Sequence, residues 1–156
     1  MKPIAARKQA AHAALAALLA AALAVPALAA EGRFTASNLL RVYPLPRAGS
    51  FEVISSRGAG PGQIWCAAAE YAQARTRPDF SRRMYISRPL SVSANEPPRK
   101  GVAFTLAPDA DLLDGPTPNN SGLTLSVKQR GFNLTVNHAN AMCGAFRDTP
   151  DCPLCP

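Results

Sequence analysis

The sequence predicts a small α+β domain in which an antiparallel sheet of about five strands packs against one helix. Short segments rich in β-forming residues recur along the chain and are joined by hairpin-length links containing glycine and proline. Only one segment has the length and apolar pattern of a core helix, whereas a parallel sheet needs a crossover helix between successive strands. The expected order is strand, strand, helix, strand, strand, strand, followed by a short C-terminal helix.

Residues 1–30 have the pattern of a secretory signal peptide. Lys2, Arg7 and Lys8 form a basic start, an Ala/Leu run follows, and small residues precede position 30. An uncleaved anchor helix is the alternative, but the run consists mainly of alanine, which is only weakly apolar. We therefore expect cleavage after residue 29 or 30.

The mature chain is long enough for one domain with a single core. We expect this domain to span residues 31–146 and an irregular tail rich in cysteine and proline to span residues 147–156. No segment after the leader is apolar enough to cross a membrane, so the expected location is the periplasm or the medium.

Two strands are expected before the helix. Residues 39–45 (LLRVYPL) and 51–56 (FEVISS) are rich in β-formers, and the link 46–49 contains proline and glycine. Proline cannot donate a ladder hydrogen bond, so Pro44 indicates an edge position for the first strand. The glycines from position 58 onward end the second strand.

The predicted helix begins at Pro61 and ends near Arg75, before the next proline. Its apolar arc includes Trp65 and Tyr71, and Trp65 alone fills much of a small core because such an aromatic buries on the order of 200 Å². We expect both residues to be core anchors, together with Phe104 from a later strand. Cys66 falls at the boundary between the apolar arc and the polar side, a position suited to a bridge to a neighbouring segment.

The second half of the chain contains three further expected strands, two loops and one ambiguous segment. The strands are expected at 83–88, 100–108 and 122–129, and the loops at 91–99 and 108–122. The segment 132–143 fits either a strand or a helix, and we favour a short helix.

Four cysteines allow three complete pairings in an oxidising compartment. Cys66 and Cys143 both lie in regular segments that the fold anchors, whereas Cys152 and Cys155 lie in the short tail. We therefore expect a structural Cys66–Cys143 disulfide and a local Cys152–Cys155 disulfide.

The Cys152-Pro-Leu-Cys155 motif also admits redox and metal chemistry. A redox dithiol of this spacing has a lowered pKa when it begins a helix, but too little of the sequence follows the motif here to form one. His138, Cys143, Cys152 and Cys155 together provide the donors of a Cys3His zinc site, although oxidation competes with metal binding after export.

The formal net charge is +7, and removal of the three basic leader residues reduces it to +4. Much of the excess is a local cluster consisting of Arg75, Arg77, Arg82, Arg83 and Arg88. Such a cluster either binds an anionic envelope or extracellular partner or forms a solvated face, and we favour the solvated face. Export excludes cytoplasmic nucleic acid as a partner.

The stretches GAGPGQIWCAAAEYA, RMYISRPLS and KGVAFTLAP, followed by a late cysteine, resemble a group of small exported bacterial proteins of unassigned function. The resemblance covers most of residues 38–143. In that group the Trp-Cys helix and a late cysteine recur, and no activity is attached to them.

No catalytic constellation is recognisable. His138 is the only histidine after the leader, a G-x-S-x-G elbow is absent, and the glycines at 58, 60 and 62 have the wrong spacing for a dinucleotide fingerprint. No cofactor is implied. The sequence predicts a non-enzymatic, exported, disulfide-stabilised binding or structural module. The alternative is a periplasmic thiol-redox or metal-binding protein that uses the C-terminal CxxC.

Overall fold

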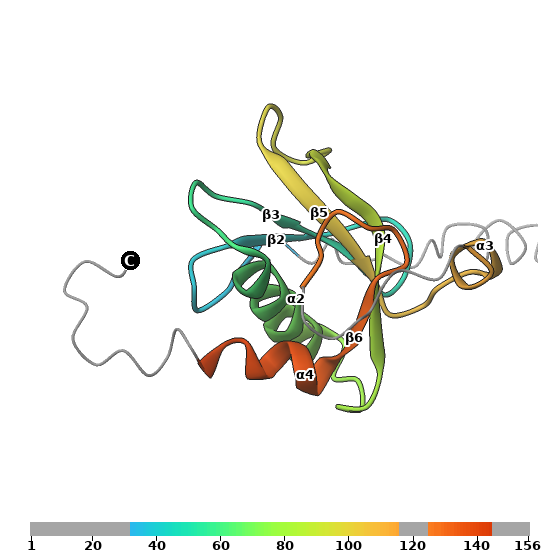
Figure 1. Ribbon diagram of the computed structural model, residues 1–156. Coiled ribbons are helices and arrows are strands. Elements are labelled where there is room, and N and C mark those ends of the chain that lie inside the picture. Colours follow the sequence, from blue (N-terminus) through green and yellow to red (C-terminus); the bar gives the residue numbers. More distant parts are fainter. Residues whose placement is uncertain (1–31, 116–124, 145–156) are drawn as a thin grey trace, which may run out of the picture. The chain divides into compact units, whose positions relative to one another are not determined.

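The computed structural model describes residues 32–115 and 125–144, in which the longest helix lies against a six-stranded antiparallel sheet (Figure 1). This arrangement confirms the predicted α+β class. The strands are β1 (Phe34–Thr35), β2 (Arg41–Pro44), β3 (Ser50–Ile54), β4 (Arg83–Val92), β5 (Lys100–Thr105) and β6 (Asn133–Thr135). The helices are α2 (Pro61–Arg75), α3 (Ala110–Leu113) and α4 (Val136–Ala141).

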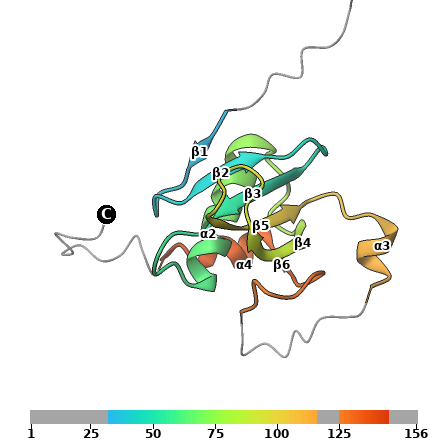
Figure 2. The same cartoon turned by 90° about the horizontal axis from the view of Figure 1, so that it is seen from above.

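The sheet consists of two hairpins joined side by side, with a short strand at each edge. Its order is β1-β2-β3-β5-β4-β6, so the hairpins β2–β3 and β4–β5 meet where β3 pairs with β5 (Figure 2). In that pairing Phe51 lies opposite Phe104 and Glu52 lies opposite Ala103. Pro44 lies on an inner strand, but β1 pairs only with Arg41 and Val42, so no partner on that side requires the missing N–H of Pro44.

Helix α2 has the predicted bounds because the sequence contains a local start signal at one end and a local stop signal at the other. Pro61 occupies the first turn, where its missing N–H costs nothing, and the side-chain oxygen of Gln63 accepts a hydrogen bond of 3.1 Å from the Gly60 N–H. At the other end, the N–H groups of Thr76 and Arg77 both donate to the carbonyl of Ala72. Arg77 has a φ of 44°, a left-handed conformation that ends helices.

An aromatic cluster joins α2 to the sheet. The ring of Trp65 meets that of Phe104 edge-on with 4.8 Å between centroids, and the rings of Phe51 and Tyr71 lie 4.6 Å apart. The indole N–H of Trp65 donates a 3.0 Å hydrogen bond to the carbonyl of Ser126. The three expected core anchors, Trp65, Tyr71 and Phe104, are all buried.

Two features of the second half differ from the prediction. The segment 125–129 forms no strand. It runs beside β4 and accepts one hydrogen bond, from the Leu90 N–H to the Val127 carbonyl. The alternation of apolar and polar residues there therefore reflects one buried side of the segment and not a ladder of strand hydrogen bonds. The segment 132–143 contains both of the elements considered for it, β6 and then α4, because the Thr135 side chain accepts from the His138 N–H and begins the helix there.

The other boundary differences are small. Strand β4 continues to Val92, so the expected loop at 91–99 begins at Ser93. The expected loop at 108–122 contains the one-turn helix α3, and its residues 116–122 lie outside the described ranges. None of the helices in the described ranges combines the length and apolar character needed to cross a membrane.

Candidate functional site

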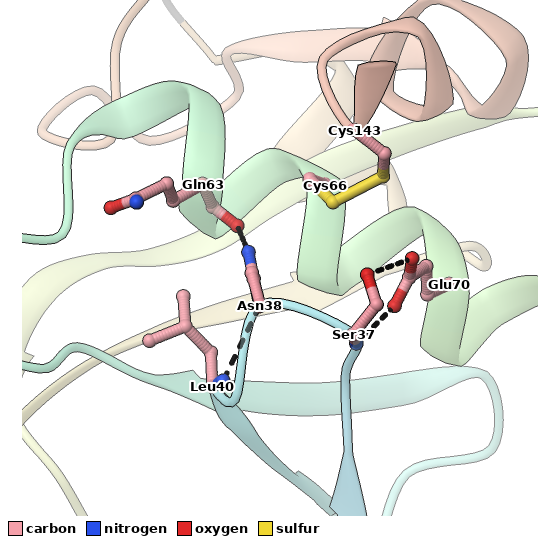
Figure 3. The surroundings of a disulfide bond; sticks show 7 residues. All are labelled: Ser37, Asn38, Leu40, Gln63, Cys66, Glu70 and Cys143. Carbon is pink, nitrogen blue, oxygen red and sulfur yellow. Dashed lines mark hydrogen bonds between the residues drawn. A yellow bond between two sulfur atoms is a disulfide. The ribbon is translucent and has the colours of Figure 1, made fainter. Parts of the chain in front are cut away.

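The expected Cys66–Cys143 disulfide is present and joins the middle of α2 to the chain just after α4 (Figure 3). The two Cα atoms are 5.0 Å apart, within the usual range for such bonds, and neither cysteine is exposed. Cys66 is therefore more deeply buried than its boundary position on the helical wheel predicted, because α4 packs against that side of α2.

A polar network adjoins the disulfide on the same face of α2. The carboxylate of Glu70, one helical turn after Cys66, accepts hydrogen bonds from the backbone N–H of Ser37 at 2.7 Å and from its hydroxyl at 2.6 Å (Figure 3). The side-chain amide of Asn38 donates a 2.7 Å hydrogen bond to the carbonyl of Gln63. The β1–β2 turn is thus fastened to α2 beside the disulfide.

Potential metal-ligating side chains gather beside the disulfide. Among residues 32–115 and 125–144, the one group of three such side chains is Cys66, Glu70 and Cys143, whose ligand atoms lie within 4.8 Å of one another. His138 is exposed on α4 and is not part of this group. Cys152 and Cys155, which belong to the alternative Cys3His set, lie outside the described residues.

The sheet also buries a carboxylate that the sequence analysis did not single out. The side chain of Glu52, in the middle of β3, is 0% exposed. It accepts hydrogen bonds from the Asn95 side-chain amide at 2.6 Å and from the Ser93 hydroxyl at 2.8 Å, and it forms an ion pair with Arg88. Glu52 therefore holds the β4–β5 loop in place.

The surroundings of Glu52 keep it ionised. Burial alone raises the pKa of a carboxyl, but the hydrogen bonds from Asn95 and Ser93 and the positive charge of Arg88 outweigh it and hold the pKa of Glu52 below its ordinary value of 4.5. This cluster has the character of a structural anchor, since each carboxylate oxygen already has close donors.

Stability is expected to decrease in acid because of this anchor. A carboxyl whose pKa is lower in the folded state stabilises the fold above its unfolded value of about 4.5 and loses that contribution as the pH falls through the folded pKa. The unfolding free energies of the wild type and of Glu52→Gln should therefore differ at pH 7 and converge as the pH falls below the folded pKa of Glu52, which is lower than 4.5. Urea titrations of both proteins across this pH range measure the difference, and a constant gap at all pH values would contradict the assignment.

Gly101 provides the space that the Glu52 side chain occupies. A Cβ at position 101 would lie 2.8 Å from Oε1 and 3.0 Å from Cδ of Glu52, and the donors around the carboxylate prevent it from moving aside. Gly101→Ala is expected to lower the free energy of unfolding by about 1–3 kcal/mol. Gly32→Ala is the control, because nothing lies within 4 Å of a Cβ there, and equal midpoints in chemical denaturation for the two variants would refute the close contact.

The arginine cluster divides into two parts in the structure. Arg88 is engaged with Glu52, whereas the other four members lie around the C-terminal end of α2 and the start of β4. Two open hollows of about 430 and 470 Å³ adjoin this region and share Arg82 and Leu106 in their walls. We call Arg75, Arg77, Arg82, Arg83 and the two hollows the arginine surface.

The arginine surface has an excess of positive charge. Within the described part of the chain, none of its four arginines forms an ion pair. Arg82 donates through Nε and Nη2 to the carbonyl of Leu106 at 3.1 and 2.8 Å, and Arg83 donates to the side-chain oxygen of Asn133 at 2.9 Å. Asp79 lines one hollow, and its carboxylate accepts from the N–H and hydroxyl of Ser81.

Apolar side chains adjoin these charges. Leu113 lines one of the hollows and is 55% exposed, and Phe80, within the loop that follows α2, is also 55% exposed. The loop is not free to rearrange, because the carbonyls of Phe80 and Arg82 accept hydrogen bonds from the N–H groups of Asn137 and Val136. The start of α4 therefore holds the backbone of Phe80 and Arg82 in position.

Comparisons with protein-family models, with curated proteins and with solved structures found no match.

Proposed function

We propose that this protein is an exported, disulfide-stabilised binding module that recognises phosphate-bearing components of the cell envelope at the arginine surface. The observation that carries the proposal is the set of four arginines without an acidic partner among the described residues, gathered beside two hollows. Guanidinium groups suit phosphate because they present several donors in one plane.

The local geometry supports anion binding in two ways. The two hydrogen bonds from Arg82 to Leu106 fix the guanidinium and use Nε and Nη2, so Nη1 retains its two N–H donors. Arg75 and Arg77 are exposed at the end of α2 and flank Thr76 and Pro78, which line the larger hollow. A fixed donor and two adjustable ones form a surface suited to repeating or clustered phosphates.

The test uses the mature protein with two phosphate sources. Long-chain polyphosphate represents a soluble polymer, and phosphatidylglycerol vesicles represent a lipid headgroup. The double variant Arg75→Glu/Arg77→Glu should weaken binding to at least one of them by about tenfold or more, since each reversal of an exposed charge costs on the order of 1 kcal/mol. Affinity should also decrease as salt is raised.

A charge-matched variant distinguishes binding at the arginine surface from general electrostatic attraction to a positively charged protein. Arg57→Glu/Lys128→Glu changes the net charge equally at two exposed positions. Arg57 precedes the N-terminal end of α2, and the 15 residues of that helix place its ends about 20 Å apart. Equal weakening by both double variants, or no binding of either probe by the wild type, would contradict the proposal.

The alternative function, thiol-redox or metal chemistry at Cys152 and Cys155, concerns residues outside the described ranges. Intact mass with and without alkylation distinguishes it, because fully oxidised cysteines support the binding module and free thiols support the alternative. Zinc measured in the same purified protein is a further check.

A further inference from the structure

We propose that reduction of the Cys66–Cys143 disulfide converts this region into a zinc site with Cys66, Cys143 and Glu70 as its three protein ligands. The proposal does not depend on the arginine surface, which lies around the C-terminal end of α2. It rests on the position of the Glu70 carboxylate, whose oxygen lies within 4.8 Å of both sulfur atoms.

The backbone already places the three donors around a common point. Cys66 and Glu70 are four residues apart on α2, a spacing that puts two side chains on one helix face, and Cys143 approaches from the chain after α4. Zinc binds thiolate sulfur at about 2.3 Å and carboxylate oxygen at about 2.0–2.2 Å, which separates ligand atoms by about 3.3–3.8 Å in a tetrahedron. Cleavage of the S–S bond frees both cysteine side chains to rotate toward these separations.

Ser37 orients the carboxylate in the way that outer partners of metal ligands do. It donates two hydrogen bonds to Glu70, one to each oxygen. Such partners fix the direction of a ligand and strengthen metal binding. Three protein ligands leave one position of the tetrahedron for water, as in open zinc sites.

The chemistry requires a reductant and releases protons. A dithiol transfers two electrons and two protons to the disulfide, first through a mixed disulfide with one cysteine, so that two cysteine thiols form and the dithiol becomes a cyclic disulfide. Zinc binding then displaces one proton from each thiol. Both cysteines are fully buried, so the exchange proceeds only when the chain around Cys143 opens locally.

The experiment uses the mature protein with Cys152→Ser/Cys155→Ser, which leaves only the two cysteines of the disulfide. A trialkylphosphine reduces the protein and is itself oxidised to the phosphine oxide with oxygen from water. Zinc affinity is then measured by competition with a chromogenic chelator, and cobalt in place of zinc reports two thiolate ligands through a thiolate-to-metal charge-transfer band. We expect one metal per chain and a higher melting temperature for the reduced protein when zinc is present.

Glu70→Gln should weaken zinc binding at least tenfold, whereas Asp114→Asn, which removes an exposed carboxylate at the end of α3, should leave it unchanged. Ser37→Ala should weaken binding less than Glu70→Gln does. The proposal is overturned if the reduced protein binds no zinc, whether or not it stays folded, or if Glu70→Gln binds as tightly as the parent. Zinc binding by the oxidised protein with equal affinity would also overturn it.

Discussion

Replacing Cys66 by serine is expected to lower the free energy of unfolding by about 4–5 kcal/mol. The disulfide connects residues separated by 77 positions, and a cross-link over such a distance removes much of the conformational entropy of the unfolded chain. The loss is comparable to the whole stability of a small domain. Denaturation in guanidinium chloride measures it, with the oxidised wild type as the reference.

The matched control for the cysteine change is Cys152→Ser/Cys155→Ser. The expected tail disulfide closes only a few residues, so its removal should change stability by less than about 1 kcal/mol. Peptide mapping without reduction identifies the bonds directly. A peptide that links Cys66 to either tail cysteine, or unchanged stability of Cys66→Ser, would show that the Cys66–Cys143 bond does not stabilise the domain.

Trp65→Ala is expected to cost about 3–5 kcal/mol, the range for removing a buried aromatic side chain. Trp65 is 0% exposed, its ring contacts Phe104 and Phe132, and its N–H is bound to the Ser126 carbonyl. The substitution therefore leaves both a cavity and an unpaired carbonyl. Thermal and chemical denaturation measure the loss.

Trp65→Phe separates the contribution of aromatic packing from that of the hydrogen bond to Ser126. It retains an aromatic ring beside Phe104 but removes the donor to Ser126, so the expected loss is about 1–3 kcal/mol. If both variants were as stable as the wild type, Trp65 would have no part in the core. Equal, large losses in the two variants would instead assign most of the effect to the hydrogen bond and the indole's extra volume.

The sequence was most informative where the signals are local. The ends of α2 follow from Pro61 and from the prolines and polar residues after Arg75. The alternation of side chains around Phe104 predicts a strand face that packs against the helix. The two residues of β1 were missed, and β6 was considered but not favoured, because short edge strands depend on their partners rather than on their own composition. The segment 125–129 was wrongly predicted to be a strand because one buried side produces an alternation of apolar and polar residues without strand pairing.

Within the candidate sites, contacts between residues far apart in the chain were the hardest feature to predict from the sequence. The disulfide could be predicted because only four cysteines compete and two lie in the fold. Glu70 was not singled out from the sequence, because nothing local connects it with Ser37, which is 33 residues away. Glu52 carried one available signal, a lone acid in an otherwise apolar strand followed later by the turn-forming Ser93 and Asn95.

The sheet order also has a consequence for the kinetics of folding. Both hairpins, β2–β3 and β4–β5, bring together residues that are close in sequence, but the β3–β5 pairing joins Ser50 to Thr105 across the whole of α2. Loop closure over such a span is slower than hairpin formation. We therefore expect the two hairpins to form early and their junction to be the rate-limiting step. Substitutions at Val53 and Val102, which face each other across that junction, should slow refolding more than substitutions at β1 do.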